Sequence, residues 1–304
     1  MHTLSRDVQL YASGKRRRPA LIYEPNMTAV SVKLKELFEP SFCDPETSEF
    51  LIKSREMSLW KLMVSDFLSL FLSRTTAHGL VGRGGMFVYS NAQIRRLLRP
   101  PHTPASAPLP PSFQFESLLD IGAGDGGVTA KMEPLFRTVY ATEFSASMRW
   151  RLRRRGYEVL PHETPFVIDP AAQSVVRRYF DVIACNNVLD RADQPQTLLR
   201  DMRDSLKPGG FLVLAVVLPW CPFVEDGPLQ KAPSEKLPME GGECCKGATY
   251  EASTTKLFEN VLIPMGFELV RWTRLPYLCE GNLRNEYALL NDAVFVLQKK
   301  SDAA

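Results

Sequence analysis

The residues with the clearest potential for chemistry surround a glycine-rich turn in the middle of the chain. Segment 117–127 reads Ser-Leu-Leu-Asp-Ile-Gly-Ala-Gly-Asp-Gly-Gly, so a short apolar run carries Asp120 near its end and leads into Gly122 and Gly124. Apolar runs of this length bounded by glycine are typical of buried strands in a parallel sheet. Glycine has no Cβ, so the backbone can turn sharply there and approach a ligand closely. Because residues 128–136 can start a helix, the segment predicts a strand, a tight loop and a helix N-terminus that cradle a nucleotide cofactor.

Two classes of nucleotide cofactor use such a loop. Gly122, Gly124 and Gly127 satisfy the G-x-G-x-x-G pattern of dinucleotide-binding proteins, in which a pyrophosphate meets the helix N-terminus. Asp120 at the strand end would repel a pyrophosphate, whereas it suits a cationic ligand with amine and sulfonium groups. The second expected strand ends in Glu143, which is placed to accept hydrogen bonds from both hydroxyls of a ribose. These residues favour S-adenosylmethionine as the cofactor, with a Rossmann-type oxidoreductase as the alternative.

The elements that must position these residues alternate between strand and helix from residue 113 onwards. Such alternation predicts a doubly wound α/β sheet with right-handed crossovers. The expected fold is that of a class I S-adenosylmethionine-dependent methyltransferase, which is Rossmann-like with a seven-stranded, mostly parallel sheet, here with an N-terminal helical extension. Ligands of such sheets bind at the carboxyl ends of the strands. Five residues are expected at this edge: Asp120, Glu143, Asn187, Asp190 and Pro219.

The chain divides into four expected parts. Residues 1–28 form a flexible basic arm, 29–98 a helical region with a lid loop, 99–112 a proline-rich linker, and 113–300 the class I methyltransferase domain.

Several local structures are expected within these parts. Residues 45–74 are read as helix, and their second half is apolar on nearly every face, which predicts a helix buried against the sheet. The glycine- and arginine-rich loop 73–85 is either a lid over the cofactor or a plain connector. Residues 225–250 are expected as an exposed insertion. The last two strands are expected at 267–274 and 292–298, with an excursion between them.

The composition narrows the class of partner. The 304 residues carry a net charge of only +3, which is too small to imply nucleic acid. Six cysteines and four histidines show no zinc-binding spacing. No apolar stretch reaches the length of a membrane span, and the N-terminus lacks the apolar core of a signal peptide, so a cytoplasmic protein is expected.

The acceptor side of the site is expected just after the fourth strand. Asn187 lies there within the sequence Cys-Asn-Asn-Val, and Asp190 follows two residues after that valine. Enzymes that methylate adenine or glutamine amides often carry Asn/Asp-Pro-Pro-aromatic at this place, so an amide or exocyclic amine acceptor is disfavoured. A neutral imidazole has a free lone pair near pH 7 and is compatible with a carboxylate that accepts its other ring N–H. Asp190 either binds an acceptor N–H or only caps the next helix.

The motifs together resemble those of the DREV methyltransferases. They are Ser73-Arg-Thr with Gly79-Leu-x-Gly82-Arg83-Gly84, Asp120-Ile-Gly-Ala-Gly-Asp-Gly126, Tyr140-Ala-Thr-Glu143, Asn187-x-Leu-Asp190-Arg-x-Asp193-Gln-Pro195, and Thr273-Arg-Leu-Pro-Tyr277-Leu-Cys-Glu-Gly281. This resemblance implies a protein-histidine methyltransferase that acts on the N1 (pros, Nδ1) nitrogen of histidine in His-x-His tracts of other proteins, where x is small. It also implies closure of the 73–85 loop over the site.

The resemblance assigns site residues by motif position. Cofactor contacts are expected from Asp120, Gly122, Gly124, Asp125, Glu143, Asn187 and Tyr277. Catalytic roles are expected for Asp190 and Asn187, and substrate contacts for Asp190, Arg83, Pro219 and Tyr287. No metal, nucleic acid or transmembrane segment is expected, and the protein is expected to be a monomer.

Two further readings stay open. An RNA or small-molecule methyltransferase is supported only by scattered arginines, and a pseudoenzyme would bind the cofactor without turnover. Family members often begin with an apolar secretory segment, so the resemblance also allows the endoplasmic reticulum as the compartment.

Overall fold

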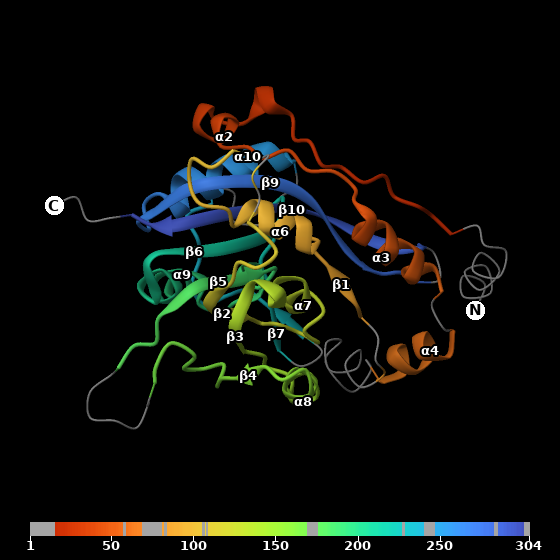
Figure 1. Cartoon of the computed structure of the whole chain (residues 1–304). Helices are drawn as coiled ribbons and strands as arrows, with labels where there is room; N and C mark the ends of the chain where they lie inside the picture. Colours follow the sequence, from red (N-terminus) through yellow and green to blue (C-terminus); the bar gives the residue numbers. More distant parts are fainter. Residues whose placement is uncertain are drawn as a thin grey trace.

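The structure is a computed structural model in which one large sheet carries helices on both faces (Figure 1). It describes residues 16–56, 59–68, 81, 84–104, 107, 109–168, 176–226, 229–239, 247–282 and 285–300. In order, the helical elements are η1 (Met27–Ala29), α2 (Val32–Glu36), α3 (Pro45–Arg55), α4 (Leu59–Leu68), α6 (Asn91–Leu97), α7 (Thr129–Met132), η2 (Glu133–Leu135), α8 (Ala146–Arg154), η3 (Leu189–Arg191), α9 (Pro195–Asp204), α10 (Tyr250–Lys256) and η4 (Leu257–Leu262).

The strands of the main sheet lie in the order β1-β9-β10-β6-β5-β2-β3-β4. Their bounds are β1 (Met86–Phe87), β2 (Phe115–Ile121), β3 (Phe136–Ala141), β4 (Glu158–Val159), β5 (Phe180–Asn186), β6 (Leu206–Val217), β9 (Phe267–Glu280) and β10 (Tyr287–Lys299). Strands β4, β3, β2, β5 and β6 are parallel, whereas β10 runs antiparallel to both β6 and β9. The expected seven-stranded class I sheet is therefore confirmed, with the short β1 added as an eighth strand on β9.

The central strands are apolar because both of their faces are covered. In β5, four successive residues from Val182 to Cys185 are completely buried, the pattern of a parallel strand between two helical layers. One face packs on α2, α9 and η4 through Leu34, Leu199 and Phe258. The opposite face packs on α6, α7 and α8. Such a sheet cannot shift its register without exposing one face, so its carboxyl edge is a rigid platform.

A separate hairpin follows the sheet edge. Strands β7 (Val224–Asp226) and β8 (Leu229–Lys231) pair with each other in antiparallel fashion within the expected insertion. Leu229 is 72% exposed, but Leu237 is buried in the core. The insertion is therefore exposed only in part.

Residues 16–28 do not form a free arm. The Arg17 carbonyl accepts the backbone N–H of Glu286, and Arg18 pairs with the Glu286 carboxylate at 2.8 Å. Further along, the backbone N–H of Asn26 donates to Glu251 at 2.9 Å. The expectation of a flexible arm is wrong for this part, because basic side chains and backbone groups meet acids that lie far away in the sequence; residues 1–15 lie outside the described range.

The helix expected over 45–74 is two helices, α3 and α4, within the described residues. Asp44 caps α3 by accepting the Thr47 N–H. On α4, Trp60, Met63 and Phe67 are 60%, 71% and 61% exposed, so the expected burial of this helix against the sheet is wrong. A helix that is apolar on many faces can also lie at a surface, and its periodicity does not distinguish the two cases.

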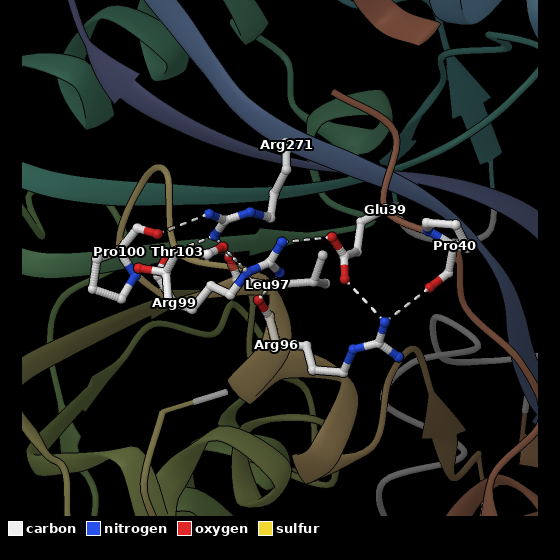
Figure 2. A network of polar contacts seen from close by, with 8 residues as sticks. All are labelled: Glu39, Pro40, Arg96, Leu97, Arg99, Pro100, Thr103 and Arg271. Atoms are coloured by element: carbon white, nitrogen blue, oxygen red, sulfur yellow. Dashed lines mark hydrogen bonds and ion pairs between the residues drawn. The ribbon is translucent and has the colours of Figure 1, made fainter. Parts of the chain in front are cut away.

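The proline-rich linker is fastened to the sheet by the network of polar contacts in Figure 2. Glu39 pairs with Arg96 at 3.0 Å and with Arg99 at 2.7 Å. Arg271 of β9 donates to the carbonyl of Arg99 at 2.6 Å and to that of Pro100 at 3.1 Å. These contacts join α2, α6 and β9, so the N-terminal region packs on the methyltransferase sheet as one unit with it.

Two further sequence expectations meet the structure in this region. The sequence leaves Ser90 or Asn91 as the cap of the helix that begins there, and the structure shows Ser90 capping α6 with a full capping box. The excursion expected over 275–291 is wrong, because β9 continues to Glu280 and β10 begins at Tyr287. In the part of the chain that the structure describes, no helix is long and apolar enough to cross a membrane.

Candidate active site

The glycine-rich turn after β2 forms the cradle expected from the sequence. Gly122 and Gly124 have φ values of +66° and +58°, which residues other than glycine rarely adopt. A Cβ on Gly122 would lie 2.6 Å from a methyl group of Val188. The turn is therefore closed by the loop that follows β5, and only glycine fits at this point.

Glu143 braces this turn from the end of β3. Its Oε2 accepts the backbone N–H of Gly124 at 3.0 Å, and its Oε1 accepts that of Ser145 at 2.9 Å. The residue is 7% exposed. Each carboxylate oxygen has a further lone pair, so the same group can accept from a ligand hydroxyl while it holds the loop.

Asp120 is the buried acid of the cradle. Its Oδ2 accepts the Thr129 hydroxyl at 2.6 Å, and the Asn186 amide lies 3.5 Å from its Oδ1. Burial raises the pKa of this carboxyl to about 7, although the bonds from Thr129 and Asn186 lower it. A cationic ligand would favour the ionised form, which is the response expected of an ammonium-binding acid.

Asp125 has a structural role in the turn. Its Oδ1 accepts the N–H of Gly127 at 2.9 Å, and its carbonyl accepts from Arg155. The cofactor contact expected at Asp125 would use the oxygen lone pairs that these two hydrogen bonds leave free.

The acceptor side lies after β5 and combines residues from the loop that follows this strand, from η3 and from β10. Asn187 is left-handed, with φ +58°, and its Nδ2 donates to Asp292 of β10 at 2.7 Å. Asp190 in η3 is 3% exposed and pairs through Oδ2 with Arg191 at 2.7 Å. The buried atoms Oδ1 of Asp190, Oδ1 of Asp292 and Oδ1 of Asn187 have no hydrogen-bond partner.

Asp190 does not cap the next helix. The cap position of α9 is Gln194, which makes no side-chain cap bond. Capping of α9 therefore does not account for the Asp190 side chain.

Tyr277 of β9 reaches the same region. Burial raises its pKa well above the ordinary value, and the nearby carboxyls of Asp292 and Asp190 raise it further. Its hydroxyl donates to the Met86 sulfur at 2.6 Å. The role of Tyr277 as a cofactor contact beside Asn187 and Asp190 stays a prediction.

Other expected substrate contacts fall in different places. Pro219 follows β6 in a loop that touches the site, because the backbone N–H of Phe223 donates to the Asp190 carbonyl at 3.0 Å. Tyr287 is the first residue of β10. Its hydroxyl donates to the Pro19 carbonyl, and the structure does not bring it to Asp190.

Arg83 and most of the 73–85 loop lie outside the described residues. At the described end of that loop, the Gly84 N–H donates to Glu280 at 3.0 Å.

Sequence reasoning missed two residues of the site. Tyr89 is completely buried, and its hydroxyl donates to the Asn186 Oδ1 at 3.1 Å, which extends the polar chain that ends at Asp120. Asp292 is also completely buried. A lone acid at the start of the apolar run Ala-Val-Phe-Val is a signal that could have identified it, whereas nothing local singles out Tyr89.

Comparison with known proteins identifies the family. The DREV methyltransferase family model matches residues 22–299. The chain belongs to the DREV methyltransferase family. Membership in this family confirms a methyltransferase with the class I fold and with S-adenosylmethionine as its cofactor.

More distant relatives match only part of the chain. A mitochondrial ubiquinone biosynthesis O-methyltransferase of Schizosaccharomyces pombe is 28% identical over 107 residues, which are 34% of this chain and 39% of that protein. The hybrid PKS-NRPS synthetase iliA of a Neonectria species is 33% identical over 117 residues, or 35% of this chain and 3% of that protein. The chain thus spans less than half the length of these relatives.

Two methyltransferases of known structure are similar to part of this chain. An S-adenosylmethionine-dependent methyltransferase from Clostridium acetobutylicum has 14% identity and a TM-score of 0.37, with 63% of this chain and 87% of that chain covered. The N-methyltransferase NodS from Bradyrhizobium japonicum, solved with S-adenosyl-L-homocysteine, has 17% identity and a TM-score of 0.35, covering 62% and 80%.

Proposed function

We propose that this DREV methyltransferase is a protein-histidine methyltransferase that modifies the N1 (pros, Nδ1) nitrogen in His-x-His tracts, where x is small. The observation that carries the proposal is the free, buried Oδ1 of Asp190 beside Asn187, at the carboxyl end of β5. The resemblance of the chain's motifs to methyltransferase-like protein nine supports the same reading.

The charges of the site favour a neutral nitrogen as the acceptor. When bound, S-adenosylmethionine supplies a methyl group on a positively charged sulfonium. Transfer to a neutral imidazole moves that positive charge onto the ring. Burial raises the pKa of both Asp190 and Asp292, and a positive charge on the acceptor would favour their ionised forms, which would stabilise it in turn. The same ionised forms would oppose an anionic oxygen nucleophile.

Asp190 can also select the reactive ring nitrogen. A carboxylate oxygen that accepts the Nε2–H of an imidazole fixes the tautomer whose Nδ1 carries the lone pair. The new N–C bond then forms as the C–S bond breaks, and the sulfur keeps that electron pair. The methylated ring is left as an imidazolium, whose remaining N–H faces Asp190 and can return its proton to solvent.

The donor half would hold the cofactor through groups already in place. Asp120 suits the methionine ammonium because its ionised form gains a cationic partner. Glu143 suits the ribose diol, and the backbone of the Gly122 turn lets the ligand approach closely. Fixed alignment of donor and acceptor supplies most of the catalysis in such a displacement.

The proposal is tested with isotopically labelled S-adenosylmethionine and three separate acceptors: His-x-His peptides, total RNA, and a pool of small metabolites. We expect label only in the peptides, and mass spectrometry should place it on Nδ1. Replacing the target histidine by lysine should abolish labelling, because an ammonium has no free lone pair. Label in RNA without label in peptide would overturn the substrate class, and cofactor binding without any turnover would indicate a pseudoenzyme.

A further inference from the structure

We propose that Asp292 is a positioning residue of the acceptor site, which turns the Asn187 amide so that its carbonyl oxygen faces the acceptor and adds a second acid beside Asp190. This inference rests on the proposed function, because it states what the acceptor pocket selects: a nitrogen group that carries N–H donors and becomes positively charged. Asp292 lies outside every motif that pointed to the site from the sequence.

The first support is the constrained geometry of Asn187. Its left-handed backbone is one that asparagine tolerates better than most residues. Its backbone N–H donates to the Ala215 carbonyl at 2.9 Å, which fixes the residue against β6. A side-chain amide has one donor end and one acceptor end. Because the donor end is held by Asp292 at 2.7 Å, the end left free is the oxygen, and this atom is buried without a partner.

The second support is the rigidity of Asp292. Its backbone is paired with Val217 of β6 on one side and with Leu275 of β9 on the other. The Tyr250 hydroxyl donates to its carbonyl at 3.0 Å, and the Arg274 guanidinium lies 4.0 Å from the centre of the Tyr250 ring. A backbone held from three directions fixes the position from which the Asp292 side chain reaches Asn187.

The third support is the free oxygen of Asp292. Buried acids are usually held by hydrogen-bond partners within the protein. Glu39 is such an acid, since Arg96 and Arg99 each hold one of its oxygens. Asp292 is completely buried, yet its Oδ1 has no partner, and the same is true of Asp190. The two acids therefore share the same situation, because each is buried and keeps one oxygen without a protein partner.

The test compares three variants of the full-length protein. Asp292→Asn keeps the shape and can still accept from Asn187, but it removes the charge. Asp292→Ala removes both. The double variant Asn187→Asp with Asp292→Asn exchanges the two groups, so that the hydrogen bond, one carboxylate and an acceptor-facing oxygen are all retained. Glu39→Gln serves as the control, because it removes a buried acid that has no access to the site.

We expect unchanged S-adenosylmethionine affinity in Asp292→Asn, Asp292→Ala and Glu39→Gln. With a His-x-His peptide, Asp292→Asn should lower kcat about tenfold through lost charge stabilisation, Asp292→Ala should lower it further, and the exchanged pair should recover at least part of the loss. Glu39→Gln should lower the melting temperature without changing kcat. Equal losses in Asp292→Ala and Glu39→Gln, or no recovery in the exchanged pair, would overturn the positioning role.

A readout independent of turnover separates this inference from the proposed function. The side-chain NH2 signals of Asn187 can be identified in ¹⁵N spectra by their disappearance in Asn187→Ala. They should exchange slowly in the wild type and rapidly in Asp292→Ala, because the carboxylate protects them. If they exchange alike, the inference fails even when the peptide is methylated. If they differ but no histidine peptide is labelled, the amide orientation stands and the proposed substrate is wrong.

Discussion

The acids in the two halves of the proposed active site differ in their hydrogen bonding. On the cofactor side, both oxygens of Glu143 and the Oδ2 of Asp120 accept hydrogen bonds from the protein itself. On the acceptor side, Asp190 and Asp292 each keep one buried oxygen without a partner. In the proposed site, the acids of the cofactor half are already held by the protein, whereas those of the acceptor half would be completed by the N–H groups of a substrate.

This difference indicates that the cofactor half determines the affinity for the cofactor and the acceptor half determines the specificity for the substrate. A carboxylate braced by backbone donors binds with little reorganisation, so its loss should affect cofactor affinity. An unpaired buried carboxylate is costly until a matching donor arrives, and that cost discriminates against substrates that lack the donor. The predictions below separate these two roles.

The largest effect is expected from Asp190→Asn. The change preserves size but removes the charge that orients the imidazole, so peptide methylation should fall about 100-fold or more. Cofactor affinity measured by calorimetry should stay unchanged, because the donor half is untouched. The matched control is Glu116→Gln, at the opposite end of β2, where the acid is exposed and pairs only with Arg137. Full activity of Asp190→Asn would show that the charge of Asp190 does not orient the acceptor, and it would contradict the proposed difference between the two halves.

Glu143→Ala should act on the cofactor half alone. It removes a charge-assisted contact to the ribose and a brace of the loop, which should weaken S-adenosylmethionine binding by about 2–3 kcal/mol. Calorimetry on the folded variant measures this directly. An unchanged dissociation constant would remove Glu143 from the cofactor site.

Gly122→Ala should weaken cofactor binding through the shape of the cradle. The new Cβ meets Val188 at 2.6 Å in addition to the strain of a positive φ. Gly209→Ala is the control, because its φ is +74° and nothing lies within 4 Å of the added Cβ. Both should lose about 1–2 kcal/mol of stability from the backbone strain, but only Gly122→Ala should also lose cofactor affinity. Equal affinities in the two variants would show that the close approach at Gly122 is unimportant.

The smallest effect is a pH dependence of cofactor binding. The pKa of Asp120 is raised to about 7 by burial, so much of the ligand-free protein carries a neutral Asp120 below that pH. A cationic ligand prefers the carboxylate, so affinity should rise by about tenfold between pH 6 and pH 8 and then level off.

The same shift predicts the stability of the ligand-free protein. Because the folded state holds the Asp120 proton more tightly than the unfolded state, stability should fall as the pH rises from about 4 to about 7. Thermal melts across this range measure the slope. A cofactor affinity that is flat from pH 6 to pH 8 would argue against an ionic contact at Asp120.

Much of the cofactor half could be predicted because its signals are local. Asp120, the glycine turn and Glu143 follow buried strands at short, regular distances, and the backbone path alone brings them together. The capping box at Ser90 is equally local, since its two hydrogen bonds join residues three apart. Local burial and turn chemistry act over a few residues, which a sequence displays directly.

The acceptor half depended on contacts between distant segments. Asn187 and Asp292 are 105 residues apart in the chain, yet they meet at 2.7 Å because β10 inserts antiparallel between β6 and β9. Pattern also failed for α4, whose apolar face is exposed, and for residues 16–28, which are held along β10 by Glu286. The periodicity of apolar residues indicates which face of a segment is apolar, but not which part of the molecule that face contacts. The sequence by itself therefore determined the sheet, the cofactor cradle and the family, whereas only the tertiary structure decided which buried acids are left unpaired for a substrate.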